Sequence, residues 1–567
     1  MKRKTVLRSI IASTTLLSLT ACGKANLTAP TAVPNVESEP ATAVTSTATE
    51  PMEYFDDYDY IVGNSKTANA TLSYATEAEN YDGLVAADDF WGVPEDGISW
   101  NTEEYDSIRE NVFKDVSTSP LSTFSADVDS ASYSNLRRLI NNGYTLSDIP
   151  KGAVRAEEMI NYFTYNYDGP EGEDPFGVNA EISTCPWNSE HKLLHLGLHT
   201  EAIVFSETPD SNIVLLVDVS GSMSDENKLP LVKESFSLLV DSLSEKDTVS
   251  IVTYASGVNV VLEGVSGDRK DKILDALDSL RAGGSTNGTG GIDEAYRVAE
   301  KNFIKGGNNR VIIASDGDFN VGKSSASDLS EQIKKKAEKG IFLSVLGYGM
   351  YNYSDTRMET LADDGNGNYA YIDTLHEAKK VLVEELGANM LTVAKDVKLQ
   401  VEFNPKYVSE YRLIGYENRA LNNEDFEDDT KDAGEIGAGH SVTVLYEIVP
   451  TTEENSNNGK DIKYQTSNLT DEALKSNDWL TLSVRYKEPD GDESKLLEYE
   501  IGSKYYTDKP SEDFIFSAAV AEFAMVVRNS EYIADGSIDH IVEELNTIPL
   551  KDEYRREFAT LVDKVNL

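Results

Sequence analysis

The feature that most constrains the fold of this chain is a short apolar run followed by oxygen-bearing side chains at alternate positions. The run covers residues 213–217, and Asp218, Ser220 and Ser222 follow it at alternate positions. Continuous apolar runs of this length are typical of strands buried on both faces of a parallel sheet. Open α/β sheets bind ligands in the loops at the carboxyl ends of such strands. Because one carboxylate and several hydroxyls suit a hard divalent cation, the segment predicts a site for an ion such as Mg²⁺.

This segment resembles the first element of the metal-ion-dependent adhesion site of von Willebrand factor A domains. In that family the second element is a loop threonine shortly before a helix, and the third is an aspartate that closes another buried strand. Here the glycine-rich loop 281–291 precedes a helical pattern and carries Thr286 at the family's spacing, with Thr289 as the alternative. The apolar run 311–314 is followed by Asp316. The resemblance therefore implies that Mg²⁺ or Mn²⁺ is held by Asp218, Ser220, Ser222, Thr286 and Asp316.

The surrounding pattern predicts one α/β domain over residues 211–392. Apolar strand-like runs alternate with amphipathic helix-like runs, which predicts a doubly wound, mostly parallel sheet with helices on both faces. One connection is too short for a crossover, so we expect a hairpin and one antiparallel edge strand, as in the resembled family. The expected strands are 213–218, 248–254, 258–262, 311–314, 341–346 and 368–372, and the expected helices are 229–243, 270–280, 292–303, 326–339 and 375–390.

A competing motif lies in the same region. Residues 317–324 match the phosphate-loop pattern G-x-x-x-x-G-K-[ST], after a predicted strand and before a predicted helix. Asp316 and Asp318 would repel a phosphate in that loop, and the hydroxyls near Asp218 would have no role. ATP binding or hydrolysis through this segment remains the alternative, with Lys323 as its basic residue. Our main expectation is that the chain is not an enzyme.

The amino terminus predicts export and lipid anchoring. Basic residues precede an apolar stretch at 10–19 that is short for a membrane span. The sequence Leu-Thr-Ala-Cys-Gly then resembles the lipobox of bacterial lipoproteins, which implies lipidation of Cys22. We therefore expect the chain at the bacterial cell membrane, held by acyl chains and facing the extracytoplasmic side or the cell surface. An ordinary signal peptide with a chance cysteine is the alternative.

Composition supports an outward-facing protein that does not bind nucleic acid. The formal net charge is −47 over 567 residues, which opposes binding to phosphate backbones and to anionic lipid surfaces. The segment that follows Cys22 is rich in Thr, Ala, Pro and Ser and then acidic and tyrosine-rich, which predicts a disordered tether. Its tyrosines could alternatively dock a partner. Cys185 has no expected disulfide partner, so we interpret it as a small buried residue.

The regions on both sides of the A domain resemble one particular group of proteins that contain such a domain. Segments 122–133, 154–163, 185–188, 365–373 and 439–447 resemble bacterial YfbK-like von Willebrand factor A lipoproteins. We favour one β-rich domain built from both flanks, with the A domain inserted, over two separate small domains. The expected organisation is a signal peptide at 1–21, a tether at 22–120, an α+β region at 121–210, the A domain at 211–392, a β-rich region at 393–510 and helices at 511–567.

The resemblance implies a binding function. A metal in the A domain would bind a carboxylate supplied by a protein partner, as an adhesion or assembly module does. Loss of Asp218 should then abolish metal-dependent binding while the fold is kept. ATP hydrolysis and a non-binding envelope scaffold remain the alternatives.

Overall fold

The computed structural model describes the larger part of the chain after residue 102. The described residues are 103, 105, 107–126, 129–172, 174–201, 209–286, 288–317, 326–350, 355–385, 391–431, 433–452, 469–489, 491 and 493–566. The predicted signal peptide, Cys22 and most of the predicted tether lie outside them. None of the described helices is both long enough and apolar enough to cross a membrane.

A mostly parallel six-stranded sheet forms the centre of the A domain, in the order β10-β9-β8-β5-β6-β7. Strand β5 pairs in parallel with β6 and β8, and β7 pairs antiparallel with β6 at the edge. The doubly wound sheet and its antiparallel edge strand were both predicted. Every residue of β5 is buried, as its continuous apolar run requires. The strands are β5 (Ser211–Asp218), β6 (Thr248–Tyr254), β7 (Val258–Ser266), β8 (Asn308–Ser315), β9 (Ile341–Tyr348) and β10 (Tyr369–Ile372).

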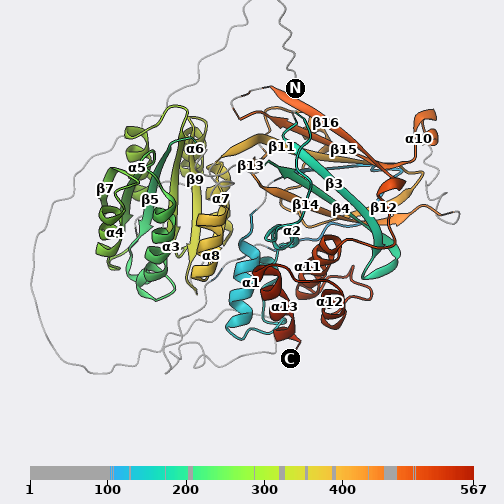
Figure 1. The fold of residues 1–567 in the computed structure, drawn as a ribbon, viewed down its shortest axis with the longest axis horizontal. Helices are drawn as coiled ribbons and strands as arrows, with labels where there is room; N and C mark the ends of the chain where they lie inside the picture. Colours follow the sequence, from blue (N-terminus) through green and yellow to red (C-terminus); the bar gives the residue numbers. More distant parts are fainter. Residues whose placement is uncertain are drawn as a thin grey trace, which may run out of the picture. The chain divides into compact units, whose positions relative to one another are not determined.

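Helices cover both faces of this sheet (Figure 1). One face packs against α3 (Leu229–Ser242), α4 (Lys270–Ser279) and α8 (Leu375–Lys379). The other face packs against α5 (Gly288–Lys301), α6 (Ala326–Ala337) and α7 (Asp355–Asp364).

Two details of the A domain differ from the sequence prediction. Helix α7 was not predicted, because its buried apolar side chains are few and lie among acidic residues. The predicted helix 375–390 is α-helical only as far as Lys379, where α8 continues into the π-helix η5 (Lys380–Glu384). Residues 386–390 lie outside the described residues.

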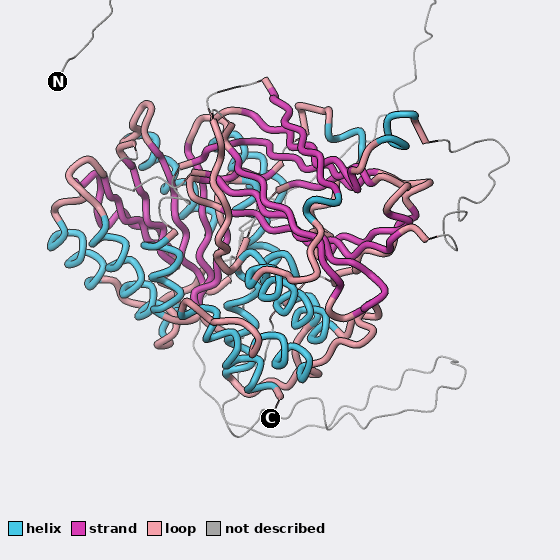
Figure 2. The backbone as a smooth tube through the Cα atoms, turned by 45° about the vertical axis from the view of Figure 1, so that its right-hand side comes forward, coloured by secondary structure: helices cyan, strands magenta, loops and turns pink. Residues whose placement is uncertain are grey.

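The flanking regions together form two antiparallel sheets, whose strands are among those drawn in magenta in Figure 2. In the first, β3 and β4 from before the A domain join β12 and β14 from after it. In the second, β2 pairs with β11, which also pairs with β15. The A domain is therefore inserted in one β-rich unit, as predicted. The strands are β1 (Lys114–Asp115), β2 (Leu121–Ser125), β3 (Phe176–Cys185), β4 (Asn188–Thr200), β11 (Thr392–Phe403), β12 (Val408–Ile414), β13 (Gly434–Gly437), β14 (Ser441–Pro450), β15 (Asp478–Lys487) and β16 (Ser494–Gly502).

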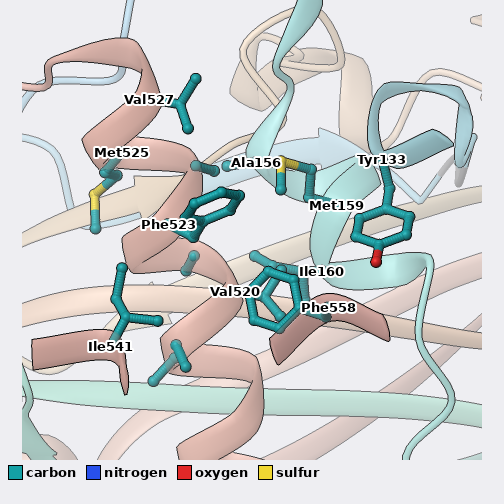
Figure 3. Packing of buried hydrophobic residues seen from close by; sticks show 14 of the residues in the cluster. Tyr133, Ala156, Met159, Ile160, Val520, Phe523, Met525, Val527, Ile541 and Phe558 are labelled. Carbon is teal, nitrogen blue, oxygen red and sulfur yellow. The ribbon is translucent and has the colours of Figure 1, made fainter. Parts of the chain in front are cut away.

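Side chains on successive strand residues face opposite sides of these sheets. Val444 and Tyr446 of β14 pack between the two sheets, whereas Leu445 packs against a layer of helices. Phe523 and Phe558 lie in the centre of that helical layer (Figure 3). Its helices are α1 (Ala131–Asn141), α2 (Ala156–Asn161), α11 (Glu512–Arg528), α12 (Ile538–Leu545) and α13 (Glu553–Val565). The remaining short helices are η2 (Lys151–Ala153), η4 (Gly221–Ser224), η6 (Asn423–Phe426), α10 (Asp471–Lys475) and η7 (Ser503–Tyr505).

Buried ion pairs connect the inserted domain to the flanking unit. The Arg137 guanidinium on α1 donates to Asp373 Oδ2 at 2.9 Å and to Glu377 Oε2 at 2.7 Å. Arg155, which precedes α2, donates to Asp355 Oδ2 at 2.9 Å and to Glu359 Oε2 at 2.8 Å. Asp373 and Glu377 follow β10, so the end of the A domain is held by charges from the N-terminal flank.

Candidate metal centre

The first predicted element lies at the carboxyl end of β5. Asp218 is the last residue of the strand and is fully buried, and the backbone N–H of Ser220 donates to its Oδ1 at 2.8 Å. The hydroxyl oxygens of Ser220 and Ser222 are 3.0 Å apart. The structure therefore brings these three predicted ligands together.

The glycine-rich loop is attached directly to this first loop. The backbone N–H of Gly221 donates to the Gly284 carbonyl at 2.9 Å, and that of Gly283 donates to the Val219 carbonyl at 2.8 Å. Gly284 has a φ of 92°, and a Cβ there would lie 2.6 Å from Ser256 Oγ. Glycine is needed for both reasons.

The attached loop carries both predicted threonine candidates. Thr286 is partly exposed and lies two residues beyond Gly284. Thr289 lies in the first turn of α5, which begins at Gly288. The predicted second element is thus positioned beside the first.

The third predicted element also meets the first. Asp316 directly follows β8 and is fully buried. The Ser315 hydroxyl donates to Asp218 Oδ2 at 3.2 Å, which joins the ends of the two strands. Burial raises the pKa of Asp218 to about 6, and the negative charge of Asp316 adds to this, while hydrogen bonds from Ser220 oppose it. A cation at this place would relieve the unfavourable burial of both carboxylates.

Lys228 is a neighbour of the site that the sequence did not reveal. Its Nζ donates to Asp316 Oδ2 at 2.9 Å, and both side chains are buried. Lys228 lies at the N-terminal boundary of α3, ten residues after Asp218 in the sequence. Nothing in the local pattern predicted that its side chain turns back toward Asp316.

The donor set fits a divalent cation that prefers oxygen ligands. Asp218 and Asp316 bring two negative charges, and Lys228 cancels one of them. No cluster of three or more His, Cys, Asp or Glu side chains suited to a metal occurs among the described residues. Among the described residues, the predicted ligands beside these two carboxylates are the hydroxyl groups of Ser220, Ser222 and Thr286. Such a weakly charged set leaves a metal able to accept an additional anionic ligand.

The other candidate residues do not form a second centre. His191, His195 and His199 bond separately to Glu447, Tyr167 and Ser441. Cys185 is a buried free cysteine, and burial raises the pKa of its thiol. Of the phosphate-loop-like segment, only Gly317 is described, and residues 318–324 lie outside the described residues.

Comparison with known families identifies the inserted domain. The family model of the von Willebrand factor type A domain matches residues 212–384. A von Willebrand factor model matches residues 99–195, and a model of the C-terminal part of the uncharacterized protein YfbK matches residues 388–567. The fold and the comparison together define a protein with a von Willebrand factor type A domain.

Among curated proteins, the uncharacterized protein YfbK of Escherichia coli (strain K12) is 42% identical over 471 residues, covering 82% of this chain and 81% of that protein. This chain belongs to the YfbK family. Human inter-alpha-trypsin inhibitor heavy chain H4 is 25% identical over 172 residues, covering 28% of this chain and 18% of that protein.

Solved structures include a von Willebrand factor type A protein from Catenulispora acidiphila. It is 14% identical with a TM-score of 0.37, and the match covers 71% of this chain and 90% of that one. Proximal thread matrix protein 1 from the mussel byssus, described with a zinc-occupied MIDAS motif, is 19% identical with a TM-score of 0.26. That match covers 31% of this chain and 45% of the mussel protein.

Proposed function

We propose that this chain is a metal-dependent protein-binding module whose A domain uses Mg²⁺ or Mn²⁺ to bind a carboxylate of a partner. The main support is the meeting of three loops around Asp218, because Gly221 bonds to Gly284 and Ser315 bonds to Asp218. A von Willebrand factor type A domain is commonly a metal-dependent protein-interaction module, and proteins of this kind are mostly not enzymes.

The proposed ligands provide both negative charge and neutral oxygen atoms. Asp218 and Asp316 supply negative charge, and their burial strengthens electrostatic attraction to a cation. The hydroxyls supply neutral oxygens, which leave the bound ion electrophilic toward an outside carboxylate. Lys228 limits the charge of the set further through its ion pair with Asp316. The proposed protein ligands are Asp218, Ser220, Ser222, Thr286 and Asp316.

The proposed location follows from the amino terminus. Lipid attached to Cys22 would anchor the chain in the bacterial membrane, and the acidic segment after it would extend the folded part outward. A Cys22→Ser variant tests the anchor. It should appear in the soluble fraction after cell fractionation, whereas the parent chain should remain with the membranes. Equal partition of the two forms would contradict the anchor.

The metal site is tested by calorimetric titration of Mg²⁺ and of Mn²⁺ into the full chain. Asp218→Asn should abolish saturable binding while circular dichroism stays unchanged. Asp225→Asn is the matched control, because Asp225 is an exposed carboxylate seven residues further along the same segment. It should bind the metal as the parent chain does.

Two results would contradict the proposal. Metal binding that survives Asp218→Asn would place the ion elsewhere. No binding by the parent chain, even with millimolar acetate present as an outside carboxylate, would favour the non-binding scaffold.

ATP hydrolysis is the less favoured alternative, because the A-domain family model spans the phosphate-loop-like segment as part of its own fold. Lys323→Ala provides the direct test. If the parent chain hydrolyses ATP and this variant does not, the alternative replaces the binding function.

A further inference from the structure

The candidate metal centre and the junction with the flanking unit lie at the same edge of the A-domain sheet. Asp316 follows β8 and Asp373 follows β10, so both lie at the carboxyl ends of parallel strands. Strand β9 lies between these two strands, which places their ends about 10 Å apart. A few side chains are therefore enough to connect the junction with the metal centre.

The side chain of Lys228 is held in place at this edge. Its Nζ donates to Asp316 Oδ2 at 2.9 Å, and its side chain is 5% exposed. Its aliphatic part lies against the backbone of Gly349, where a Cβ would be 2.8 Å from Lys228 Cγ and closer still to Cε. Gly349 also has a φ of 86°. The ammonium group is therefore held beside Asp316 by a backbone position that only glycine occupies without a clash.

Tyr371 of β10 bonds to the same glycine. Its side chain is buried, and its hydroxyl donates to the Gly349 carbonyl. Tyr371 packs on the face of the sheet that α5 covers, whereas Lys228 immediately precedes α3 on the other face. Gly349 contacts both residues because it follows β9, where the chain leaves the sheet.

Helix α1 of the flanking unit holds Tyr371 in turn. The guanidinium of Arg138 lies 5.2 Å from the centroid of the Tyr371 ring. Arg138 also donates to both carboxylate oxygens of Glu103, at 2.8 and 3.0 Å. The preceding residue, Arg137, donates to Asp373 just beyond β10. Bidentate arginine–carboxylate bonds and desolvated cation–π contacts are strong, so α1 fixes the end of β10.

The position of Lys228 matters because of its charge. Beside Asp316 its ammonium group offsets one of the two proposed carboxylate ligands and repels a divalent cation. Withdrawal of the ammonium group would remove both effects. A cation that binds better when Lys228 is withdrawn shifts the protein toward that arrangement. The contacts of Gly349, Tyr371 and Arg138 oppose the withdrawal.

We propose that the flanking unit regulates the metal centre through Arg138, Tyr371, Gly349 and Lys228. While α1 holds Tyr371, Lys228 stays on Asp316 and the affinity for the metal is low. Loosening of this contact raises the affinity, and by linkage metal binding loosens α1 to the same extent. This inference rests on the proposed metal-binding function and adds its regulation.

The first test is calorimetric titration of Mg²⁺ and of Mn²⁺ into the full chain and its Tyr371→Phe variant. The substitution removes the hydroxyl that bonds to Gly349 and keeps the ring beside Arg138. The variant should bind the metal about fivefold more tightly or better, the lower end of couplings between distinct sites. Tyr411→Phe is the matched control, because Tyr411 is a buried strand tyrosine whose hydroxyl donates to the Leu121 carbonyl at 2.8 Å. It should leave the affinity unchanged.

Two more variants act on the other end of the connection. Arg138→Met removes the cation from the Tyr371 ring, and Glu103→Gln weakens the hold on Arg138 while keeping the size of the side chain. Both should raise the affinity for the metal. Circular dichroism checks the fold of each variant, and Glu103→Gln tests the connection if Tyr371→Phe or Arg138→Met does not fold.

A double-mutant cycle separates this connection from a general loosening of the fold. In a Lys228→Met background, Tyr371→Phe should produce no further gain in affinity, because the ammonium group through which it acts is gone. The reciprocal effect is measured by amide hydrogen exchange in α1. Exchange there should become faster when Mg²⁺ is added to the parent chain and should not change in Lys228→Met.

The outcomes distinguish failure of the regulation from failure of the metal-binding function. No metal binding by the parent chain would overturn both. Binding that Asp218→Asn abolishes, with equal affinity in the parent chain and in the folded Tyr371→Phe, Arg138→Met and Glu103→Gln variants, would overturn the regulation alone. An equal gain from Tyr371→Phe with and without Lys228 would show that the effect does not pass through Lys228.

Discussion

Lys228 Nζ lies 2.9 Å from Asp316 Oδ2, and both side chains are buried beside the loop that carries Asp218. The protein therefore already places a positive charge next to the proposed metal ligands. This ammonium offsets the charge of Asp316 in the free protein and would repel an incoming divalent cation.

Lys228→Met is expected to reduce the stability of the metal-free protein. Removal of one partner of a buried ion pair costs about 3–5 kcal/mol. Added Mg²⁺ or Mn²⁺ should recover more stability in this variant than in the parent chain, because the competing ammonium is gone. Thermal unfolding with and without metal measures both effects.

The matched control for that experiment is Lys233→Met on the same helix. Lys233 donates to the carbonyl of Asp278 at the surface, away from Asp316. Lys233→Met should change neither the stability of the metal-free protein nor the stability gained on adding metal appreciably. Weaker metal binding by Lys228→Met than by the parent chain would show that Lys228 supports the site instead of opposing the ion.

Arg137→Met is expected to destabilise the junction between the A domain and the flanking unit. The substitution leaves the buried carboxylates of Asp373 and Glu377 without their guanidinium partner. The expected loss is about 3–5 kcal/mol in the free energy of unfolding, measured in urea. Arg556→Met on α13 is the control, since the exposed side chain of Arg556 donates to the backbone carbonyls of Leu550 and Lys551 and to no carboxylate among the described residues. A loss as small as the control's would contradict this role.

His195 is expected to make stability depend on pH in the acid range. Burial lowers its pKa from 6.5 to about 4. Because the unfolded chain binds a proton that the folded chain does not, stability falls as pH decreases from 6.5 toward 4. The contribution is about 3 kcal/mol across that window.

His195→Gln isolates this contribution, since glutamine can still bond to Tyr167 but does not titrate. The difference in unfolding free energy between parent and variant should shift in favour of the variant as pH falls. His199→Gln, on the same strand but only partly buried, should show a smaller shift. If the unfolding free energies of the parent chain and of His195→Gln changed in parallel with pH, the buried, neutral state of His195 would be refuted.

Cys185 is expected to be unreactive in the folded protein. Burial both shields its sulfur and raises its thiol pKa, so little reactive thiolate is present at neutral pH. In a Cys22→Ser background, a thiol reagent should label Cys185 only after denaturant is added. Rapid labelling of the folded chain would show that the end of β3 and the helical layer against which it packs open readily.

The sequence predicted the parts of the site that depend on local pattern. The continuous apolar runs of β5 and β8 identified buried parallel strands, and their ends placed Asp218 and Asp316 at one edge of a sheet. The glycines before Thr286 indicated a loop that precedes a helix, and the structure bonds this loop at Gly284 to the loop after β5.

Only the tertiary structure decided the partners of the charged side chains and the extent of the less regular helices. Lys228 meets Asp316 from 88 residues away in sequence, and Arg137 meets Glu377 from 240 residues away. The local sequence pattern predicts which strands and helices form and which of their faces are buried, because apolar periodicity depends on residues that are close together in the sequence. Ion pairs, cavities and the joining of β4 with β14 depend on how distant segments are brought together, and the packing of the whole fold determines that.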